Sequence, residues 1–195
     1  RRDPVAMIAL CVVLALILMA VFAPLVAPAD PYRASMLRRL RPIGTEGFPL
    51  GTDELGRDRL SRLIYGGRLS LLMGVTPVFI AFLIGSVIGI TAGYLGGKVN
   101  SVLMSTIDVF FAFPSVLLAI ALSGALGAGI FNGLLSLTVV FIPPIARIAE
   151  SVTTAVRRIE YVEAARASGA SSFAIVRVHV LGNVIGPVFV YATGL

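Results

Sequence analysis

Three long stretches of this sequence carry no charged side chain, and they limit the possible folds more than any other feature. Residues 5–29, 69–97 and 109–146 contain no Asp, Glu, Lys or Arg. About 20 apolar residues in a helix cross the hydrocarbon core of a bilayer. The chain as a whole is 57% hydrophobic and 13% charged, which leaves too few polar residues to cover a soluble globule. The sequence therefore predicts an all-α integral membrane protein.

The N-terminal run predicts a first transmembrane helix over residues 5–27, preceded by a short end over residues 1–4. Asp3 is placed to cap this helix, and Pro4 suits its first turn. Pro24 and Pro28 are expected to end it. A secretory signal peptide is the alternative interpretation of this run. Because the apolar stretch is long for a signal peptide and more such stretches follow, we favour a membrane span.

A polar segment over residues 28–68 separates the first two apolar runs. It contains the sequence Leu-Gly-Thr-Asp-Glu-Leu-Gly-Arg-Asp at residues 50–58. Its glycines allow tight turns, and its acidic side chains can accept hydrogen bonds from nearby backbone N–H groups. By itself this pattern indicates a capped turn. Leu60, Leu63 and Ile64 then share one helical face, which predicts a short interfacial helix before a second span near residues 71–95.

Three glycines repeat every four residues in the second span, at Gly85, Gly89 and Gly93. In a lipid environment, such a small-residue face lets two helices approach closely and pack by dispersion forces. The face therefore predicts a tight helix–helix contact. The contact lies either within this chain or against a second membrane subunit, and the sequence leaves both open.

The third uncharged stretch, residues 109–146, is about twice the length of one span. A glycine-rich sequence at residues 124–129 divides it. We therefore expect a helical hairpin with spans near residues 102–123 and 130–150.

Prolines and two charged residues mark this hairpin. Pro114, Pro143 and Pro144 predict bends or interrupted backbone hydrogen bonds, which serve either packing or gating. Arg147 and Glu150 lie three residues apart, so we expect their side chains to pair on one helix face near the membrane surface.

A segment of mixed polarity, residues 157–182, precedes the last apolar run at residues 184–195. Its small or apolar residues recur at a helical spacing of three and four, at Val162, Ala165, Gly169, Phe173 and Val176. Gly169 suits a left-handed turn that ends one short helix before the next begins. The lack of side-chain bulk around Gly169 would let another protein approach the backbone closely. We therefore predict a short docking helix.

At these residues the sequence resembles the membrane-spanning permease subunits of binding-protein-dependent ATP-binding-cassette importers. Their cytoplasmic signature is Glu-Ala-Ala, three residues, Gly, nine residues, then Ile-x-Leu-Pro. Glu163, Ala164, Ala165, Gly169 and Leu181 match this signature, whereas His179 and Gly182 stand in the places of its isoleucine and proline. The missing proline predicts a less rigid bend before the next span. The sequence His-Val-Leu-x-Asn at residues 179–183 is similar to the version in the dipeptide/oligopeptide branch.

The resemblance implies a type I importer permease fold with six spans, of which this chain would contain five, the fifth truncated. It implies that the docking helix couples the permease to a cytoplasmic ATPase through Tyr161, Glu163, Ala164, Ala165, Arg166 and Gly169. It also implies that the polar segment is an extracytoplasmic loop. The recurrent motif of that loop comprises Gly51, Thr52, Asp53, Gly56, Arg57 and Asp58.

The implied function is ATP-driven import, with a dipeptide or oligopeptide as the favoured substrate. The implied partners are a second permease subunit, usually a paralogue, cytoplasmic ATP-binding subunits that carry ATP and Mg, an extracytoplasmic substrate-binding protein and membrane lipid. The implied location is the cell (inner) membrane of a prokaryote. Lys and Arg are divided eight and eight between the two sides, so the positive-inside rule does not choose an orientation. The resemblance does, and implies a cytoplasmic N-terminus.

We expect no catalysis, cofactor, metal or nucleic acid on this chain itself. It lacks a Gly-x-x-x-x-Gly-Lys-[Ser/Thr] phosphate loop, and one His with one Cys does not make a usual zinc ligand set. His179 is expected to be a packing or membrane-surface residue. A secondary transporter or channel acting alone, or a membrane scaffold, stays as the alternative function. The substrate, whether a dipeptide, a longer peptide, a nickel chelate or haem, is not determined by the sequence.

Overall fold

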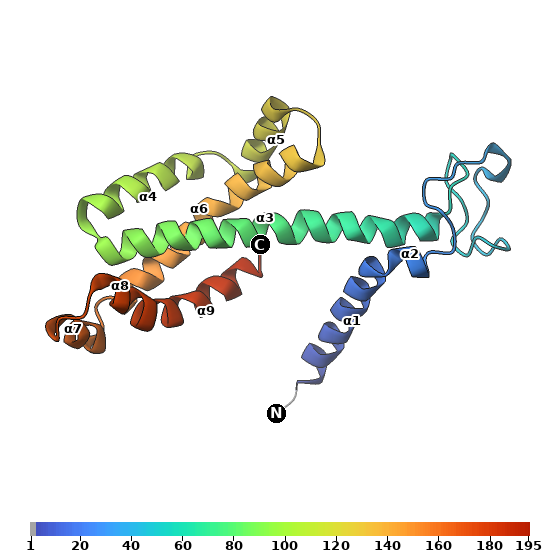
Figure 1. Cartoon of the computed structure of the whole chain (residues 1–195). Helices are drawn as coiled ribbons and strands as arrows, with labels where there is room; N and C mark the ends of the chain where they lie inside the picture. Colours follow the sequence, from blue (N-terminus) through green and yellow to red (C-terminus); the bar gives the residue numbers. More distant parts are fainter. Residues whose placement is uncertain (1–2) are drawn as a thin grey trace. The chain divides into compact units, whose positions relative to one another are not determined.

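The computed structural model describes residues 3–195, and this part of the chain consists of helices joined by short turns and one long loop (Figure 1). Two isolated β-bridges, Thr45–Phe48 and Thr52–Asp58, are the only strand pairings within the described range. The chain divides into two compact units, the first up to Gly74 and the second from Val75 to Leu195. The predicted all-α class is confirmed.

The first unit begins with α1 (Pro4–Val21) and the one-turn helix α2 (Ala23–Val26). Asp3 caps α1 as expected, because its Oδ1 accepts a hydrogen bond from the backbone N–H of Val5 at 3.0 Å. Most side chains of α1 are both apolar and exposed, as a helix surrounded by lipid requires. Of the predicted N-terminal end, Arg1 and Arg2 lie outside the described residues.

Helix α3 (Arg59–Leu95) starts earlier than the sequence suggested. The expected short interfacial helix and the expected second span are one continuous helix, so the polar loop ends at Asp58 instead of residue 68. The arginines of this region do not interrupt the helix, because arginine is a good helix former. Pro77 lies inside α3 without ending it.

The second unit is organised around α6 (Ile130–Val156), which contacts α4 (Gly97–Phe111), α5 (Ser115–Leu126) and α9 (Leu181–Ala192) (Figure 1). Its largest buried cluster joins side chains from the C-terminal part of α3 with others from α6 and α9, such as Ile145, Val184 and Val188. Phe82 and Phe189 meet edge to face in this contact, with ring centroids 6.1 Å apart.

The three spaced glycines of α3 pack directly against α6. A Cβ atom on Gly85 would lie 2.9 Å from Ile145 Cγ2, and one on Gly93 would lie 2.8 Å from Thr153 Cβ. A Cβ on Gly89 would lie 2.6 Å from the Cβ of Ala149. The structure therefore places this glycine face within the chain, as one of the two possibilities that the sequence left open.

The expected span at residues 102–123 is two helices. Helices α4 and α5 are bent by 85° relative to each other at a break around Pro114. Proline has no N–H to donate, and its ring clashes with the carbonyl four residues earlier, so a helix breaks readily there. Pro143 and Pro144 behave differently and remain inside the uninterrupted α6. Gly127 and Gly129 separate α5 from α6 with positive φ angles of 86° and 155°.

The C-terminal helices also run further than expected. Helix α6 reaches Val156 rather than residue 150. After the short helices α7 (Glu160–Ala167) and α8 (Ser172–Ile175), a π-helical turn, η2 (Val176–Val180), leads directly into α9. The last run is therefore helical from residue 172, and the chain continues through Gly182 without the bend that the family's proline would introduce.

Four helices are long and apolar enough to cross a membrane, and the bent pair α4–α5 raises the number to five if it forms one span. The five apolar passes expected from the sequence agree with the larger number. The 85° turn of the bent pair suits either a broken span or a re-entrant segment.

Arg147 and Glu150 do not pair with each other, contrary to the sequence-based expectation. Arg147 forms an ion pair with Asp108 of α4. Glu150 instead accepts hydrogen bonds from Asn100 Nδ2 at 2.6 Å and Thr154 Oγ1 at 3.0 Å. Spacing within α6 made the first pair plausible, but the packing of α4 beside α6 brought closer partners to both side chains.

The glycine face predicts that substitutions of two glycines in α3 change the stability of the protein in opposite directions. Gly89→Ala places a methyl group against α6 and is expected to destabilise the protein by about 1–3 kcal/mol. Gly74→Ala is the control, because nothing lies within 4 Å of its Cβ position and alanine is the better helix former by about 0.5–1 kcal/mol. Unfolding midpoints in mild detergent measure both changes. Equal midpoints for the two variants would contradict the close packing.

Candidate functional site

A short helix, α7, lies where the docking helix was predicted, and it ends as expected. Helix α7 has Glu160 and Glu163 in its first turn and Arg166 in its last turn, which complements the helix dipole. Gly169 follows with a φ of 83°. The N–H of Gly169 donates to the carbonyl of Arg166 at 3.0 Å, and that of Ala170 donates to the carbonyl of Ala165 at 3.1 Å. These two bonds form a Schellman motif, whose left-handed position favours glycine above all other residues.

One side chain packs α7 against the rest of the second unit. Val162 is fully buried in the same cluster as Ile175, Val180 and Val184. Ala165, one turn later, packs against this cluster. Phe173, which follows Val162 and Ala165 at a helical spacing in the sequence, is 76% exposed. The chain turns at Gly169, so the two short helices do not continue one face.

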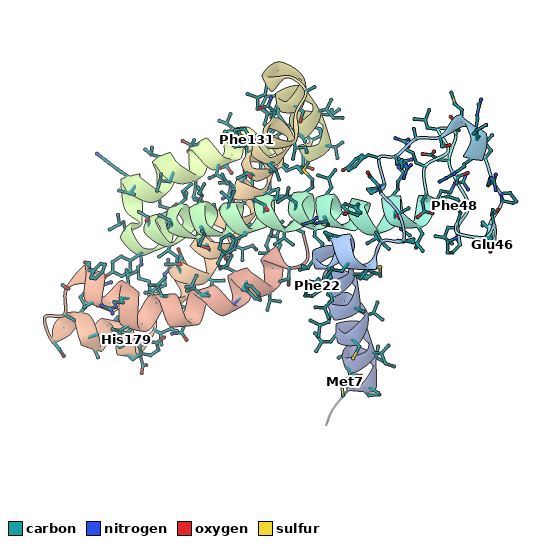
Figure 2. All side chains as sticks on the ribbon, turned by 45° about the vertical axis from the view of Figure 1, so that its right-hand side comes forward. Met7, Phe22, Glu46, Phe48, Phe131 and His179 are labelled. Atoms are coloured by element: carbon teal, nitrogen blue, oxygen red, sulfur yellow. The ribbon has the colours of Figure 1, made fainter. Side chains whose placement is uncertain are left out.

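A polar contact fixes the other side of α7. The hydroxyl of Tyr161 accepts a hydrogen bond from Asn183 Nδ2 at 3.1 Å, and Asn183 also donates to the carbonyl of His179 at 2.6 Å. The rings of Tyr161 and His179 lie 5.6 Å apart between centroids. His179 belongs to the π-helical turn η2 and lies near the end of the second unit that carries α7 (Figure 2). It acts as a packing residue, as the sequence indicated.

A polar cleft of about 390 Å³ lies between α7 and the C-terminal end of α3. Arg157 donates to the carbonyl of Tyr94 at 2.9 Å, and the guanidinium of Arg166 lies 6.0 Å from the centre of the Tyr94 ring. Glu163 and Arg158 also line this cleft. Three arginines and one acid give the cleft a net positive charge, which suits an acidic partner surface.

The six residues predicted to couple to an ATPase therefore divide into two sets. Tyr161 and Ala165 contact the body of the second unit. Glu163, Ala164, Arg166 and Gly169 are exposed, and nothing lies within 4 Å of the Cβ position of Gly169. Another protein could reach the small exposed residues without displacing any side chain.

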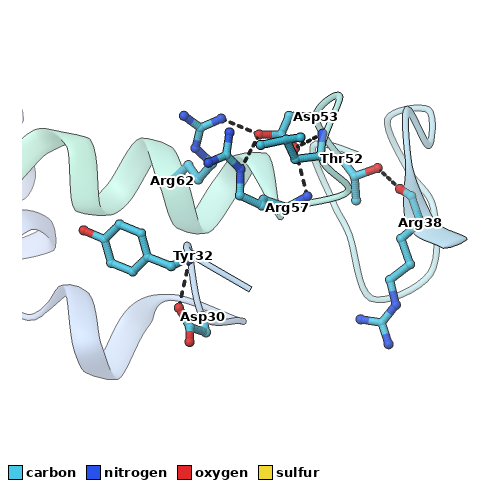
Figure 3. A network of polar contacts seen from close by, with 8 residues as sticks. Asp30, Tyr32, Arg38, Thr52, Asp53, Arg57 and Arg62 are labelled. Atoms are coloured by element: carbon cyan, nitrogen blue, oxygen red, sulfur yellow. Dashed lines mark hydrogen bonds and ion pairs between the residues drawn. The ribbon is translucent and has the colours of Figure 1, made fainter. Parts of the chain in front are cut away.

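The long loop of the first unit is organised around Asp53 (Figure 3). Its Oδ1 accepts hydrogen bonds from the backbone N–H groups of Leu55 and Arg57, both at 2.9 Å. Its Oδ2 pairs with Arg57 Nε at 2.8 Å and with the guanidinium of Arg62. Burial raises the pKa of Asp53, but the hydrogen bonds and the charge of Arg57 outweigh that effect and lower it to about 2.

The other motif residues close the same loop. The fully buried Thr52 accepts from the backbone N–H of Arg41 at 2.9 Å and donates to the carbonyl of Arg38. Gly51 and Gly56 have φ angles of 70° and 69°. A Cβ atom on Gly51 would clash with the backbone of Arg41, and one on Gly56 would clash with the backbone of Ser35. These contacts tie distant parts of the loop to one another.

Asp58 ends the loop and starts α3. Its Oδ2 accepts hydrogen bonds from Ser61 N at 2.8 Å and Ser61 Oγ at 2.6 Å, which is the geometry of a helix N-cap. Ser61 Oγ in turn accepts from the backbone N–H of Ala29 at 3.0 Å. The motif is therefore the capped turn that its residues indicated, and Ser61 is a member that sequence reasoning missed.

The loop surface available to a partner lies outside the motif. Large apolar side chains are exposed there, including Met36, Leu37 and Ile43, and Leu37 is 91% exposed. No sequence pattern singled them out, because their importance depends on which side chains the loop turns outward. Among residues 3–195 there is no cluster of three or more His, Cys, Asp or Glu side chains that could hold a metal ion.

Comparison with known proteins decides the family. The family described as "Binding-protein-dependent transport system inner membrane component" matches residues 85–193, which include α7, the Schellman turn and the glycine face. The chain belongs to this family. A second family, "N-terminal TM domain of oligopeptide transport permease C", matches residues 1–42. The resemblance to dipeptide/oligopeptide importer permeases is thereby confirmed, and the protein is a multi-pass inner membrane protein.

Curated relatives carry the similarity along nearly the whole chain. The probable D,D-dipeptide transport system permease protein DdpC of Escherichia coli is 36% identical over 99% of this chain and 64% of its own length. The di/tripeptide permease DppC of Pseudomonas aeruginosa is 39% identical, over 92% and 61%. The glutathione permease GsiD of Pectobacterium atrosepticum is 35% identical, over 97% and 63%. The chain spans somewhat less than two thirds of the length of these relatives.

The low pKa of Asp53 predicts how the loop responds to acid. A folded-state pKa of about 2, below the ordinary 3.8, means that the ionised carboxylate stabilises the loop above about pH 4 and that this contribution is lost as the pH falls through 2. We expect Asp53→Asn to speed proteolytic cleavage within the loop roughly tenfold at pH 7. At pH 2, with pepsin, the ratio of mutant to wild-type cleavage rates is expected to approach one.

Glu54→Gln is the matched control, because this neighbouring acid is exposed. Its cleavage rate should follow the wild type at both pH values. A ratio for Asp53→Asn that does not change between pH 7 and pH 2 would refute the assigned role of the carboxylate.

Proposed function

We propose that this chain is the translocating subunit of an ATP-driven importer and that α7 is its coupling helix. The observation that carries the proposal is the division of α7 into two faces. Val162 is buried in the cluster that holds Val180 and Val184, while Glu163, Ala164 and Gly169 are open to a partner. A partner that moves α7 would therefore move the helices packed behind it.

The mechanism follows from these contacts. Side chains of α6 and α9 share the cluster that receives Val162, and Arg157 ties the end of α6 to the end of α3 through Tyr94. Closure of two ATPase subunits around ATP would push on α7 and tilt these helices together. Such tilting exchanges inward for outward access. The exchange requires the ATPase to bind the two arrangements with different free energies.

The proposed topology places α7 in the cytoplasm, where ATP is available. Residues 157–182 then form the cytoplasmic coupling segment. Alternation of spans sets the N-terminal end in the cytoplasm and the loop at residues 28–58 outside. ATP and Mg would be held by the partner ATPase, and this chain would hold neither.

Further partners follow from the same arrangement. A second permease subunit, usually a paralogue, would complete the pathway. An extracytoplasmic binding protein would deliver substrate to the rigid loop, with exposed side chains such as Leu37 and Ile43 as contacts. The relatives are named for D,D-dipeptides, di- and tripeptides and glutathione, so a short peptide is the proposed substrate class.

Copurification tests this function. The full-length chain, expressed with the products of neighbouring genes and extracted in mild detergent, should bring with it an ATPase, and peptide should enter vesicles only when ATP is present. Uptake driven by an ion gradient without an ATPase would indicate a secondary transporter. Absence of both an ATPase and any uptake would indicate a scaffold.

Gly169 offers the sharpest variant of the docking surface. Gly169→Arg adds bulk to an open surface and is expected to lower recovery of the ATPase at least tenfold while the protein still inserts in the membrane. Gly169→Asn is the matched control, because asparagine tolerates the left-handed turn and adds less bulk. It should retain most of the ATPase. Wild-type transport by Gly169→Arg would refute the docking role.

A further inference from the structure

An ion pair joins α4 and α6 of the second unit, and its two members flank the uncharged stretch at residues 109–146. Asp108 of α4 pairs with Arg147 of α6. Asp108 follows Lys98 by ten residues, and Arg147 precedes Arg157 by ten, which places both about 15 Å along their helices from those terminal charges. That distance is about half the thickness of a bilayer core.

This pair is only half covered by the chain. The side chain of Asp108 is 53% exposed, and that of Arg147 is 43% exposed. Charged groups at this depth are disfavoured against lipid by about 2.5–3.5 kcal/mol each, and in membrane proteins they face the interior of an assembly or a water-filled cavity. The face of α4 and α6 that carries the pair is therefore not a lipid-facing surface.

An apolar cavity of about 550 Å³ lies next to the pair. Phe110 and Phe111, the residues that follow Asp108 by two and three positions, line it together with Pro143 and Pro144, which precede Arg147 by one turn. The guanidinium of Arg147 lies 6.0 Å from the centre of the Phe111 ring. The ion pair thus reaches the cavity through Arg147 and the lining residue Phe111, and the volume of the cavity is typical of small-molecule sites.

We propose that Asp108, Arg147 and this cavity form a transient site for a zwitterionic short peptide on the translocation pathway. The peptide's ammonium group would bind Asp108, its carboxylate would bind Arg147, and an apolar side chain would enter the cavity. The proposal rests on the proposed import function and adds to it the residues that contact the substrate inside the membrane.

Exchange of ionic partners explains why such a site would bind weakly. In the free protein the two side chains neutralise each other, and with peptide bound each pairs with a terminal charge of the opposite sign. The exchange leaves each charge with a partner of opposite sign. A pathway site must release its ligand as readily as it admits it, and a ligand that competes with an existing ion pair meets that need.

The test uses cysteine labelling in the full-length permease with its copurified ATPase. In a Cys11→Ser background, Ser115→Cys places a thiol at the cavity lining, and Val87→Cys on an exposed apolar face of α3 is the lipid-facing control. A charged, water-soluble methanethiosulfonate reagent should label Ser115→Cys at least tenfold faster than Val87→Cys. Equal rates would overturn the proposal, because the cavity would then not face water.

Protection by peptide tests the two charges separately. Phenylalanylalanine is expected to slow labelling of Ser115→Cys. Adding Arg147→Gln should raise the half-protecting concentration of the free peptide at least tenfold but leave that of the C-terminal amide unchanged. Asp108→Asn should likewise raise the half-protecting concentration of the free peptide but leave that of the N-acetylated peptide unchanged. If the pair were purely structural, both variants would change the half-protecting concentration equally for all of these peptides. That result would overturn the proposal.

A charge-swapped protein covers the case in which a single variant does not accumulate. Asp108→Arg combined with Arg147→Asp keeps an ion pair with its charges exchanged. The half-protecting concentrations of the N-acetylated and the C-terminally amidated peptide should then exchange relative to wild type. An unchanged preference would count against the site. Wild-type protein that captures an ATPase but shows no peptide protection refutes this inference alone, whereas failure to capture any ATPase refutes the proposed function itself.

Discussion

The close approach of α3 and α6 is the contact on which the second unit depends. Along this interface three glycines of α3 pack against α6. Gly85, Gly89 and Gly93 lie against Ile145, Ala149 and Thr153, respectively. Lipid provides no hydrophobic drive for helices to associate, so dispersion contacts at short range must hold them together. The same approach brings the C-terminal end of α3 within hydrogen-bonding distance of Arg157. Tyr94 of α3 and Arg157 then line the cleft next to α7.

Two acidic side chains of this apolar protein are satisfied by several partners each. Glu150 is bonded by Asn100 from α4, and Asp53 gathers two backbone N–H groups and two arginines into one loop. A buried polar group left without a hydrogen-bond partner destabilises the fold, by about 1–3 kcal/mol in proteins. Asp108 and Arg147 satisfy each other yet remain half exposed, which distinguishes them from the purely structural pairs.

Helix α7 combines two properties that a coupling element needs. It is short and nearly free of bulk on its outer face, so a partner groove can enclose it. It is also fixed by Val162 in the core and by Tyr161 at Asn183, so a displacement is passed on instead of absorbed locally. The Schellman turn at Gly169 ends the helix abruptly and keeps the proposed docking surface compact.

The sequence by itself determined the helical class, the cap of α1 at Asp3, the turn at Gly169 and the docking helix before it, because local hydrogen bonding and hydropathy depend on residues close in the chain. Only the tertiary structure decided that the glycine face meets α6, that Arg147 pairs with Asp108 instead of Glu150, and that Phe173 faces outward. These outcomes depend on which helices lie side by side. Spacing along one helix shows which residues share a face, but the partner that covers the face comes from elsewhere in the chain.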